Sequence, residues 1–572
     1  MGDKLITIKI GGEAGFGIKV AGEILGKVIL RMGYQLCDYS EYPSLIRGGH
    51  NTFEITIGKK VFAHVRPVNL LIALNQRTFD EHLPELSPDC GIIFDGGKVK
   101  PTSERYRLYD VPFSELARQA GGTELVKNTV ALGAALAVLG GRVEGLLELL
   151  KETFSKKSPQ IIAMNQTAAR LGYEYVKNKY SQPFAYQVEP SEVQNSIYVT
   201  GNEAVALGAV AGGISAYFAY PMTPSSSVLE FMSKHGPNLG ILVRQPEDEI
   251  SVLNSAIGAG FAGARAMVGT SGGGFSLMTE ALGLSGITET PVVIFMAQRP
   301  GPATGLPTWS GQGDLRFLMH AAQDEFPRVI LAPGDAEECF YLTAQAANFA
   351  EKFQIPVFVL SDKNLGEGGM TAPRFDQSKV KIERGEWLSS QALSADHPYL
   401  RYKVTESGVS PRVLPGTENG VHIANSDEHD EYGYNNESSA NRNAQMEKRM
   451  RKQEQVLKQV PPPVLYGPKT AGLTLVSWGS NKGAVLQALQ ELSDKSVNFL
   501  HFAYLWPFPT PEAAELLIGA KKLLVVESNF SGQFEGMIKQ YVGRVPEEHL
   551  RKYDGRPFWP HEIVAKIKSA LN

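Results

Sequence analysis

Three acidic residues precede an apolar helical segment in the middle of the chain, in the stretch RQPEDEISVLNSAIGAGFAG at 244–263. Pro246 suits a first helical position, and Glu247, Asp248 and Glu249 fill the first turn, where the helix dipole favours carboxylates. One interpretation is therefore that these acids only complement the dipole on a solvated turn. In the other, Glu249, directly before the apolar face, points into a crevice and is functional. The local pattern leaves both open.

The segment YPMTPSS at 220–226 follows a predicted strand, 216–219. Its two prolines restrict the turn, so Thr223 presents its hydroxyl in a fixed place. Ligands of parallel α/β sheets bind beyond the carboxyl ends of strands, which makes Thr223 a candidate ligand-binding residue. Ser225 and Ser226 are equally well explained as helix caps.

A long segment rich in glycine and proline, QRPGPATGLPTWSGQGDL at 298–315, follows another predicted strand. Irregular loops of this length at a strand end are usually functional or mobile. Arg299 is suited to a carboxylate ligand, and Thr304 and Thr308 add hydroxyl groups. The alternative is that Arg299 is a surface residue paired with Asp314.

A glycine-rich turn, GGEAGFG at 11–17, lies between a predicted strand and a predicted helix. Free backbone N–H groups at such a helix start suit a phosphate. The spacing from Gly12 is G-x-x-G-x-G, which differs from the dinucleotide fingerprint, although Asp38 lies at a distance suited to a ribose. A phosphate site, a nicotinamide or flavin site and a purely structural turn all remain possible. Arg47, in the loop EYPSLIRGG, is a further phosphate or partner contact, or a solvated side chain.

Helices and strands alternate along most of the chain, which predicts an α/β fold with parallel sheets covered on both faces. Around the acidic segment, a helix of small residues, the strand 266–270, the turn SGGG and an apolar strand form a β-α-β unit. The second domain is predicted to open with the strand 197–200. We predict three α/β domains, at 1–185, 196–368 and 467–572, and a polar linker at 369–466. In this linker the basic run MEKRMRKQEQ predicts a charged helix with a solvated face.

The bulk composition is that of a soluble globular protein. The 572 residues are enough for three or four domains, and a net charge of -4 gives no reason to expect nucleic acid. No apolar stretch approaches the ~20 residues of a transmembrane helix, and the N-terminus does not resemble a signal peptide, so we expect a cytoplasmic protein without membrane contact. Cys37, Cys90 and Cys339 stand far apart, which excludes a four-cysteine iron–sulfur or zinc site within this chain, and no metal ligands are predicted in it.

Taken in order, GGEAGFG, EYPSLIRGG, YPMTPSS, EDEISVLNSAIGAG, TSGGGFSLM and QRPGPATGLPT resemble the 2-oxoacid:ferredoxin oxidoreductase family. The similarity covers nearly the whole chain and is to the α-type subunit with a γ-type domain fused in front. It implies that the central domain is of the type that binds the pyrimidine of thiamine diphosphate, and that the C-terminal domain is transketolase-like. It also implies a β subunit that carries the diphosphate-binding domain, Mg²⁺ and a [4Fe–4S] cluster, in an (αβ)₂ assembly that uses ferredoxin and coenzyme A.

The resemblance also assigns roles to residues. Glu249 is expected to hydrogen-bond the aminopyrimidine ring nitrogen and so to promote proton removal from the thiazolium carbon. The other implied contacts are Tyr220 and Pro221 for the cofactor; Thr223, Arg299 and Thr308 for the 2-oxoacid; and Gly12, Gly15, Gly17 and Arg47 for coenzyme A. The lack of a GDG motif with a downstream Asn pair places the metal–diphosphate site in another chain, so this chain is expected to be inactive alone.

The function implied is coenzyme A-dependent oxidative decarboxylation of a 2-oxoacid to an acyl-coenzyme A and CO₂, with electrons passed to ferredoxin, or the reverse carboxylation. We expect 2-oxoglutarate as substrate, because a two-chain plan without a fused ferredoxin resembles that branch of the family. Its second carboxylate would need a second cation, such as Arg244 or Arg316. The alternatives are a pyruvate, branched-chain or aryl 2-oxoacid enzyme, and a non-catalytic dinucleotide-binding redox subunit.

Overall fold

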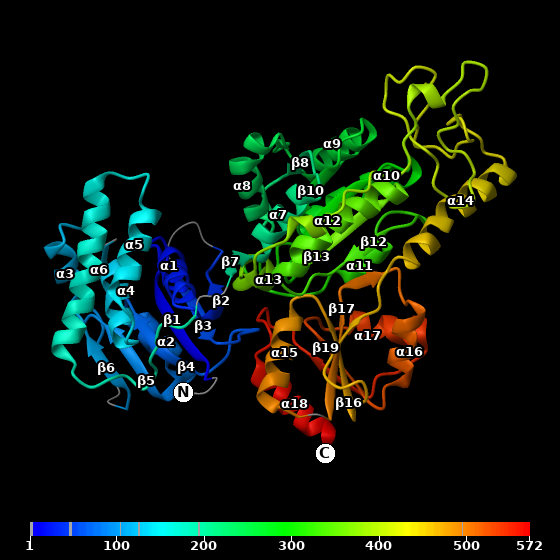
Figure 1. The fold of residues 1–572 in the computed structure, drawn as a ribbon. Helices are drawn as coiled ribbons and strands as arrows, with labels where there is room; N and C mark the ends of the chain where they lie inside the picture. The colour runs from blue at the N-terminus through cyan, green and yellow to red at the C-terminus, as the bar shows by residue number, and fades with distance from the viewer. Residues whose placement is uncertain (1–3, 45–48, 103–104, 124–125, 193–194, 495) are drawn as a thin grey trace. The chain divides into compact units, whose positions relative to one another are not determined.

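The computed structural model describes residues 4–44, 49–102, 105–123, 126–192, 195–494 and 496–572. The chain divides into two compact units. The first consists of Met1–Val199, Gly368–Arg374 and Trp559–Glu562, and the second of Thr200–Glu367, Phe375–Phe558 and Ile563–Asn572. The helices and strands of each unit are labelled in Figure 1. No helix in the described ranges is both long and apolar enough to cross a membrane.

The first unit is built on a mixed sheet of eight strands in the order β6-β5-β4-β1-β3-β2-β14-β7. Strand β1 pairs parallel with β4 and antiparallel with β3. The bounds are β1 (Ile6–Glu13), β2 (Gln35–Glu41), β3 (His50–Gly58), β4 (Val68–Ala73), β5 (Leu86–Phe94), β6 (Arg107–Asp110), β7 (Ser196–Thr200) and β14 (Gly369–Pro373).

Helices cover both faces of this sheet, because consecutive strand residues, which point to opposite faces, are apolar. Leu70 and Ile72 of β4 belong to the core shared with α1, α4 and α5, whereas Leu71 packs in a separate core with Phe79 of α2. Gly133 of α4 lies so close to the backbone of α6 that any side chain there would collide with it. The helices are α1 (Ile18–Arg31), α2 (Gln76–His82), α3 (Phe113–Gln119), α4 (Lys127–Val138), α5 (Val143–Thr153) and α6 (Pro159–Lys179).

The second unit contains a sheet of seven strands in the order β18-β12-β13-β11-β10-β8-β9, and only β18 among these is antiparallel to its neighbour. In the ribbon, α7 and α12 lie together, as do α9 and α10 (Figure 1). The strands are β8 (Ala216–Ala219), β9 (Leu242–Arg244), β10 (Ala266–Thr270), β11 (Val292–Gln298), β12 (Val329–Leu331), β13 (Pro356–Asp362) and β18 (Tyr504–Trp506). The helices are α7 (Gly201–Ala211), α8 (Ser226–His235), α9 (Glu249–Phe261), α10 (Gly272–Ile287), α11 (Leu315–His320), α12 (Ala336–Phe353) and α13 (Lys363–Glu367).

The C-terminal part of the second unit forms a five-stranded sheet in the order β15-β17-β16-β19-β20. One apolar core joins it to the seven-stranded sheet, since Trp478 and Phe502 pack in the same cluster as Val268 and Ile294. The remaining elements are α14 (Ser439–Leu457), β15 (Val464–Tyr466), β16 (Leu473–Trp478), α15 (Asn481–Leu492), β17 (Val497–Phe502), α16 (Pro511–Gly519), β19 (Leu523–Glu527), α17 (Gln533–Met537), β20 (Glu548–Arg551) and α18 (Pro560–Leu571).

Three local expectations from the sequence are corrected by the structure. Strand β7 was expected to open the second domain, but it pairs within the first sheet, where β14 also lies. Helix α9 begins at Glu249 and not at Pro246, because the Asp248 carboxylate accepts the Ser251 N–H at 2.8 Å and so caps the helix. Helix α14 is present, but Lys448 and Lys452 on it are fully buried, so its basic face is not solvated.

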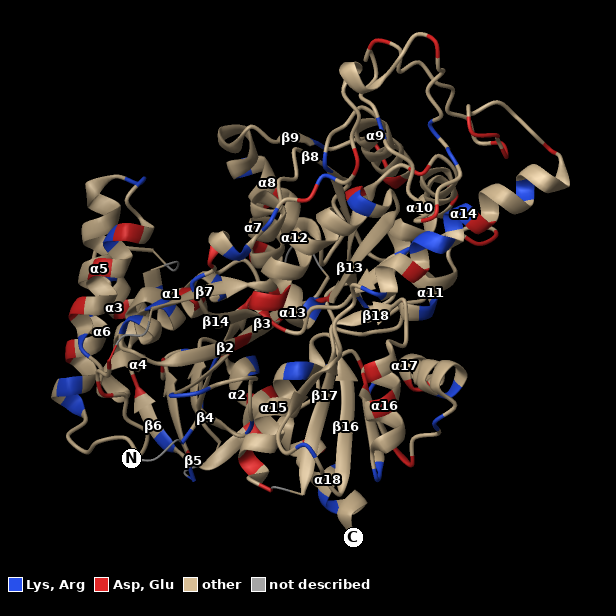
Figure 2. Cartoon of the chain, turned by 45° about the vertical axis from the view of Figure 1, so that its right-hand side comes forward, with Lys and Arg blue, Asp and Glu red and all other residues tan. Residues whose placement is uncertain are grey.

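The lysines of α14 are buried because each of them forms an ion pair with Glu289. Lys448 Nζ lies 2.5 Å from Glu289 Oε1, and Lys452 binds the other carboxylate oxygen. Figure 2 shows the lysines and arginines distributed along α14. Glu289 lies much earlier in the sequence than α14. The pattern of the helix alone therefore predicts a solvated basic face.

Candidate active site

Four neighbouring parallel strands of the second unit end at the same edge of the sheet. The chain leaves β8 at Tyr220, β9 at Gln245, β10 at Ser271 and β11 at Arg299. The segments that contain Tyr220, Thr223, Glu249 and Arg299 therefore all start from this edge, as the sequence predicts. A carboxylate, a guanidinium and hydroxyl groups at the carboxyl ends of parallel strands form the usual setting of an α/β active site.

Glu249 lies at the start of α9 and is only 4% exposed. Its Oε1 atom has no hydrogen-bond partner among the described residues. A Cβ atom on Gly274, in the first turn of α10, would lie 2.6 Å from that oxygen, so only glycine leaves room for the carboxylate. A buried carboxylate oxygen without a donor is costly, which points to a ligand that supplies the missing hydrogen bond.

Thr223 and Arg299 are brought together by the fold. Arg299 Nη1 donates a hydrogen bond to the carbonyl oxygen of Thr223 at 2.8 Å. Partial burial lowers the pKa of Arg299, and the nearby Asp314 opposes that shift. In turn, burial raises the pKa of Asp314 to about 6, against the effect of Arg299. The guanidinium is thus tied to the turn at Thr223 and has room for an anionic ligand, because only one of its hydrogen bonds is used in this contact.

Thr308 is buried, at 4% exposure, and its hydroxyl oxygen lacks a hydrogen-bond partner within the described ranges. The loop after Thr308 is held by residues that the sequence pattern did not single out. Ser310 donates to Asp362 at 3.2 Å, and Gln312 accepts from Asn481 at 2.8 Å. Asp362 ends β13, so its place at a strand end was the one available signal. For Gln312 and Asn481 no signal exists, because they are far apart in sequence.

The two residues predicted next to the cofactor are exposed. Tyr220 is 38% exposed, and Pro221 is exposed as well. Of the two extra cations, Arg244 is exposed at the end of β9. Arg316 lies in α11, where its backbone N–H donates a hydrogen bond to Gln533 Oε1 at 2.9 Å. The structure shows the position of these residues without assigning them a ligand.

The glycine-rich turn of the first unit differs in detail from the expected one. Strand β1 continues to Glu13, so Gly12 is paired within the sheet, opposite Asn51. Gly15 and Gly17 form the turn, with φ of +90° and +76°, and Gly17 precedes the first turn of α1. Arg47, the fourth residue predicted to contact coenzyme A, lies outside the described residues.

Asp38 does not offer its carboxylate to a ribose. It is 6% exposed in β2 and accepts a hydrogen bond from the Tyr198 hydroxyl. Burial raises the pKa of Asp38 to about 7, although the bond from Tyr198 lowers it. A dinucleotide site needs an accessible acid at this position, so the structure argues against the dinucleotide-binding alternative.

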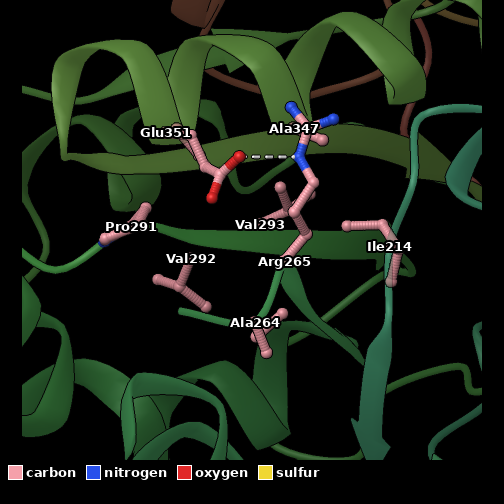
Figure 3. A pocket seen from close by; sticks show the side chains of 10 residues that line it. Ile214, Ala264, Arg265, Pro291, Val292, Val293, Ala347 and Glu351 are labelled. Carbon is pink, nitrogen blue, oxygen red and sulfur yellow. Dashed lines mark ion pairs between the residues drawn. The ribbon is translucent and has the colours of Figure 1, made fainter. Parts of the chain in front are cut away.

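A small internal cavity in the second unit lies at the opposite edge of the sheet. It is lined by Arg265 and Glu351, whose side chains form an ion pair at 3.0 Å, and by apolar residues that include Pro291 (Figure 3). Arg265 and Pro291 directly precede β10 and β11, so this cavity is at the amino ends of the strands. Its volume of about 10 Å³ is that of a single water site, which excludes a substrate.

Comparison with known proteins identifies the family. Residues 207–449 match the family described as pyruvate flavodoxin/ferredoxin oxidoreductase, thiamine diphosphate-binding, and residues 7–175 match pyruvate ferredoxin/flavodoxin oxidoreductase. The α subunit of 2-oxoacid:ferredoxin oxidoreductase 2 from Aeropyrum pernix is 33% identical over 99% of this chain and 98% of its own length. This chain belongs to the 2-oxoacid:ferredoxin oxidoreductase family.

Other members of the 2-oxoacid:ferredoxin oxidoreductase family are also similar over the full length. The 2-oxoglutarate oxidoreductase subunit from Mycobacterium tuberculosis is 27% identical over 99% of this chain and 91% of its own. A solved structure of 2-oxoglutarate:ferredoxin oxidoreductase from Magnetococcus marinus, with 2-oxoglutarate, coenzyme A and succinyl-CoA bound, superimposes with a TM-score of 0.93 at 32% identity and covers 100% of both chains. The fold class, the family and the oxidoreductase activity predicted from the sequence are thereby confirmed, and the chain contains a thiamine diphosphate-binding region.

Proposed function

We propose that this chain is the α subunit of a 2-oxoglutarate:ferredoxin oxidoreductase that forms succinyl-CoA and CO₂, or runs in reverse. The support is the similarity over full length to 2-oxoglutarate enzymes from two organisms, one of them solved with 2-oxoglutarate and coenzyme A. In this proposal a β subunit supplies the diphosphate-binding domain, Mg²⁺ and a [4Fe–4S] cluster. The two chains form an (αβ)₂ enzyme that reduces ferredoxin. The cytoplasmic location stays a prediction.

The observation that carries the proposal is the buried, unpartnered Oε1 of Glu249. A carboxylate in this state fits the aminopyrimidine ring of thiamine diphosphate, whose ring nitrogen shares a proton with it. Gly274 of α10 fits the same group, since it keeps the approach to the carboxylate free of a side chain. Thiamine diphosphate, when bound, supplies the electron sink for decarboxylation.

The residues of this chain then bind and orient the reactants. With thiamine diphosphate bound, Glu249 would hold a proton at its Oε1, facing the aminopyrimidine of the cofactor. Arg299 binds the 2-oxoacid carboxylate, with the Thr223 carbonyl fixing the guanidinium. The Thr308 hydroxyl, which has no partner among the described residues, donates to the carbonyl oxygen of the 2-oxoacid that is adjacent to this carboxylate. The placement of Tyr220 and Pro221 against the cofactor, and of Gly12, Gly15, Gly17 and Arg47 against coenzyme A, belongs to the same proposal.

Replacement of Glu249 by Gln tests this function. The chain is co-expressed with its β subunit, and reduction of a viologen is followed with 2-oxoglutarate, pyruvate, branched-chain and aryl 2-oxoacids in the presence of coenzyme A. We expect the wild type to prefer 2-oxoglutarate and the E249Q variant to lose about 10²-fold or more in kcat, the usual scale for a proton-transfer group.

Glu247→Gln is the matched control, because Glu247 stands in the same segment but is exposed. Its turnover is expected to equal that of the wild type. Unchanged proton exchange at the thiazolium carbon in E249Q would refute the role of Glu249. A preference for another 2-oxoacid would refute the substrate while leaving the role of Glu249 intact.

A further inference from the structure

Two histidines and a glutamate from separate segments of the first unit meet beside its sheet. His50 begins β3, and Glu81 and His82 end α2. The Nε2 atoms of the histidines lie 3.0 Å apart, and one ligand atom from each of the three residues lies within 4.8 Å of the other two. We propose that these three side chains bind a divalent transition-metal ion of the Zn²⁺ type, with water as the remaining ligand.

The distance between the two histidine nitrogens suits a tetrahedral ion. Zn–N bonds of about 2.0–2.1 Å at a tetrahedral angle hold two nitrogens about 3.3 Å apart. The observed 3.0 Å between the Nε2 atoms of His50 and His82 needs to open by only a few tenths of an ångström. Imidazole and carboxylate together are typical ligands of Zn²⁺ and its neighbours in the first transition row.

The second nitrogen of His82 is already oriented as in metal sites. Its Nδ1 lies 3.2 Å from Glu85 Oε2. A carboxylate beside this nitrogen favours the tautomer with the hydrogen on Nδ1, which leaves the lone pair on Nε2 free for a metal. Metal-binding histidines generally have such a partner.

The charged groups beside the two histidines balance one another. The positive charge of Lys9, which lies 3.4 Å from His82 Nδ1, is balanced by Glu54 at 3.2 Å and by Glu85. The local charge thus does not repel a cation.

The competing interpretation is a hydrogen bond between two histidines without any ion. Glu81 pairs with Arg77 at 2.6 Å in that case, but both side chains are about half exposed, and such pairs contribute little stability. Release of Glu81 toward an ion therefore costs little. The sequence predicts no metal ligands here because the histidines are 32 residues apart, and only the fold joins them.

The test uses the full chain without an affinity tag, treated with a chelator and titrated with Co²⁺ alone. We expect visible ligand-field absorption that saturates at one equivalent and is displaced by Zn²⁺. His50→Gln and His82→Gln are expected to abolish the absorption, and Glu85→Gln to weaken binding by 10- to 100-fold, the usual effect of losing an orienting partner. His561→Ala, an exposed histidine of the same unit, is the matched control and is expected to bind as the wild type does.

Glu81→Gln keeps the experiment decisive if a histidine variant does not fold, because the Glu81 side chain is exposed and contributes little to the fold. The Glu81→Gln variant is expected to fold with the thermal unfolding midpoint of the wild type and to bind Co²⁺ more weakly. Absence of the absorption in the wild type would overturn the site. Equal absorption in the wild type, Glu81→Gln and His50→Gln would also overturn it, since the ion would then bind elsewhere on the surface.

Discussion

At the scale of single residues, the position of the Glu249 carboxylate depends on Gly274. A methyl group at Gly274 would lie 2.6 Å from Glu249 Oε1, a distance that no real contact tolerates. Gly274→Ala is therefore expected to displace the carboxylate and to lower kcat about as strongly as a direct change at Glu249, by about 10²-fold, the scale of a lost proton-transfer group. The measurement is kcat with 2-oxoglutarate in the reconstituted enzyme.

Gly273→Ala is the control for this change. A Cβ on Gly273 would meet its nearest neighbour, a backbone oxygen, at 3.9 Å, which is an ordinary contact. The kcat of Gly273→Ala is expected to stay near that of the wild type. The two variants gain the same helix propensity, so a difference in kcat does not come from that gain. Equal activity of the two alanine variants would contradict the placement of Glu249 in the reaction.

Arg299 is expected to act on both binding and turnover. In the proposed function, replacing Arg299 with Ala removes a charged hydrogen bond to the 2-oxoacid carboxylate, for which we expect a loss of about 1.5–3 kcal/mol, or about 10- to 100-fold in kcat/KM. Both a higher KM and a lower kcat are expected in steady-state kinetics. Arg299→Lys keeps the charge without the planar fork and should recover part of the loss. A lower thermal unfolding midpoint with unchanged kinetics would show a structural role instead.

At the scale of elements, the buried charges of α14 give the clearest prediction. Two lysines face one carboxylate: burial lowers the pKa of Lys448 to about 7 and that of Lys452 to about 8, while Glu289 opposes both shifts. Glu289→Gln leaves two cations without a buried carboxylate partner, and we expect a loss of about 3–5 kcal/mol in the free energy of unfolding. Lys448→Met keeps a balanced pair of Glu289 and Lys452 and should cost much less.

The same lysines predict the pH dependence of stability. Between about pH 7 and the usual lysine range, the unfolded chain holds protons that Lys448 has released in the folded chain. The unfolded state then binds more protons, so the free energy of unfolding rises with pH in that window. Thermal unfolding at pH 7 and pH 9 measures this rise, which should shrink in Lys448→Met. An equal rise in both proteins would contradict the assignment to Lys448.

Elements that are determined by local patterns were predictable from the sequence. The strands Ala216–Ala219 and Ala266–Thr270 have the predicted bounds, because short apolar runs between predicted helices favour buried strands. Strand β14 was missed: its five residues carry little pattern of their own, and it forms by pairing with β2, more than 300 residues away. The start of α9 shifted for a local reason, since an Asp cap outweighs a Pro in the first turn.

In the candidate site, too, features set by local sequence were predictable and features set by long-range contacts were not. Residues at strand ends, such as Glu249 and Arg299, were predictable because the carboxyl ends of parallel strands converge. The hydrogen bond from Asn481 to Gln312 was not predictable, since it joins the loop to an element 169 residues later in the sequence. The two histidines of the proposed metal site were missed for the same reason. Long-range pairing thus decides the details of each site, and local pattern decides where each site lies.

At the scale of the whole molecule, exposed apolar side chains indicate where the partner subunit binds. Ile250 and Phe261 on α9 and Leu277 on α10 are 48%, 38% and 50% exposed, on the two helices that start at Glu249 and Gly272. Apolar side chains of this size on packed helices are typical of interaction surfaces. In the proposed function a β subunit completes the cofactor site beside these two helices, so we expect the chain alone to show no turnover.

Leu277→Asp tests this surface. The charge is expected to prevent co-purification with the β subunit and to abolish turnover, because burying an unpaired carboxylate at an interface is costly. The thermal unfolding of the isolated chain should not change, since half of the Leu277 side chain is already in water. Val421→Asp, at a residue 91% exposed in another segment, is the control and should assemble normally. An active, fully assembled Leu277→Asp enzyme would place the partner on a different face and would remove the physical reason for the exposure of these helices.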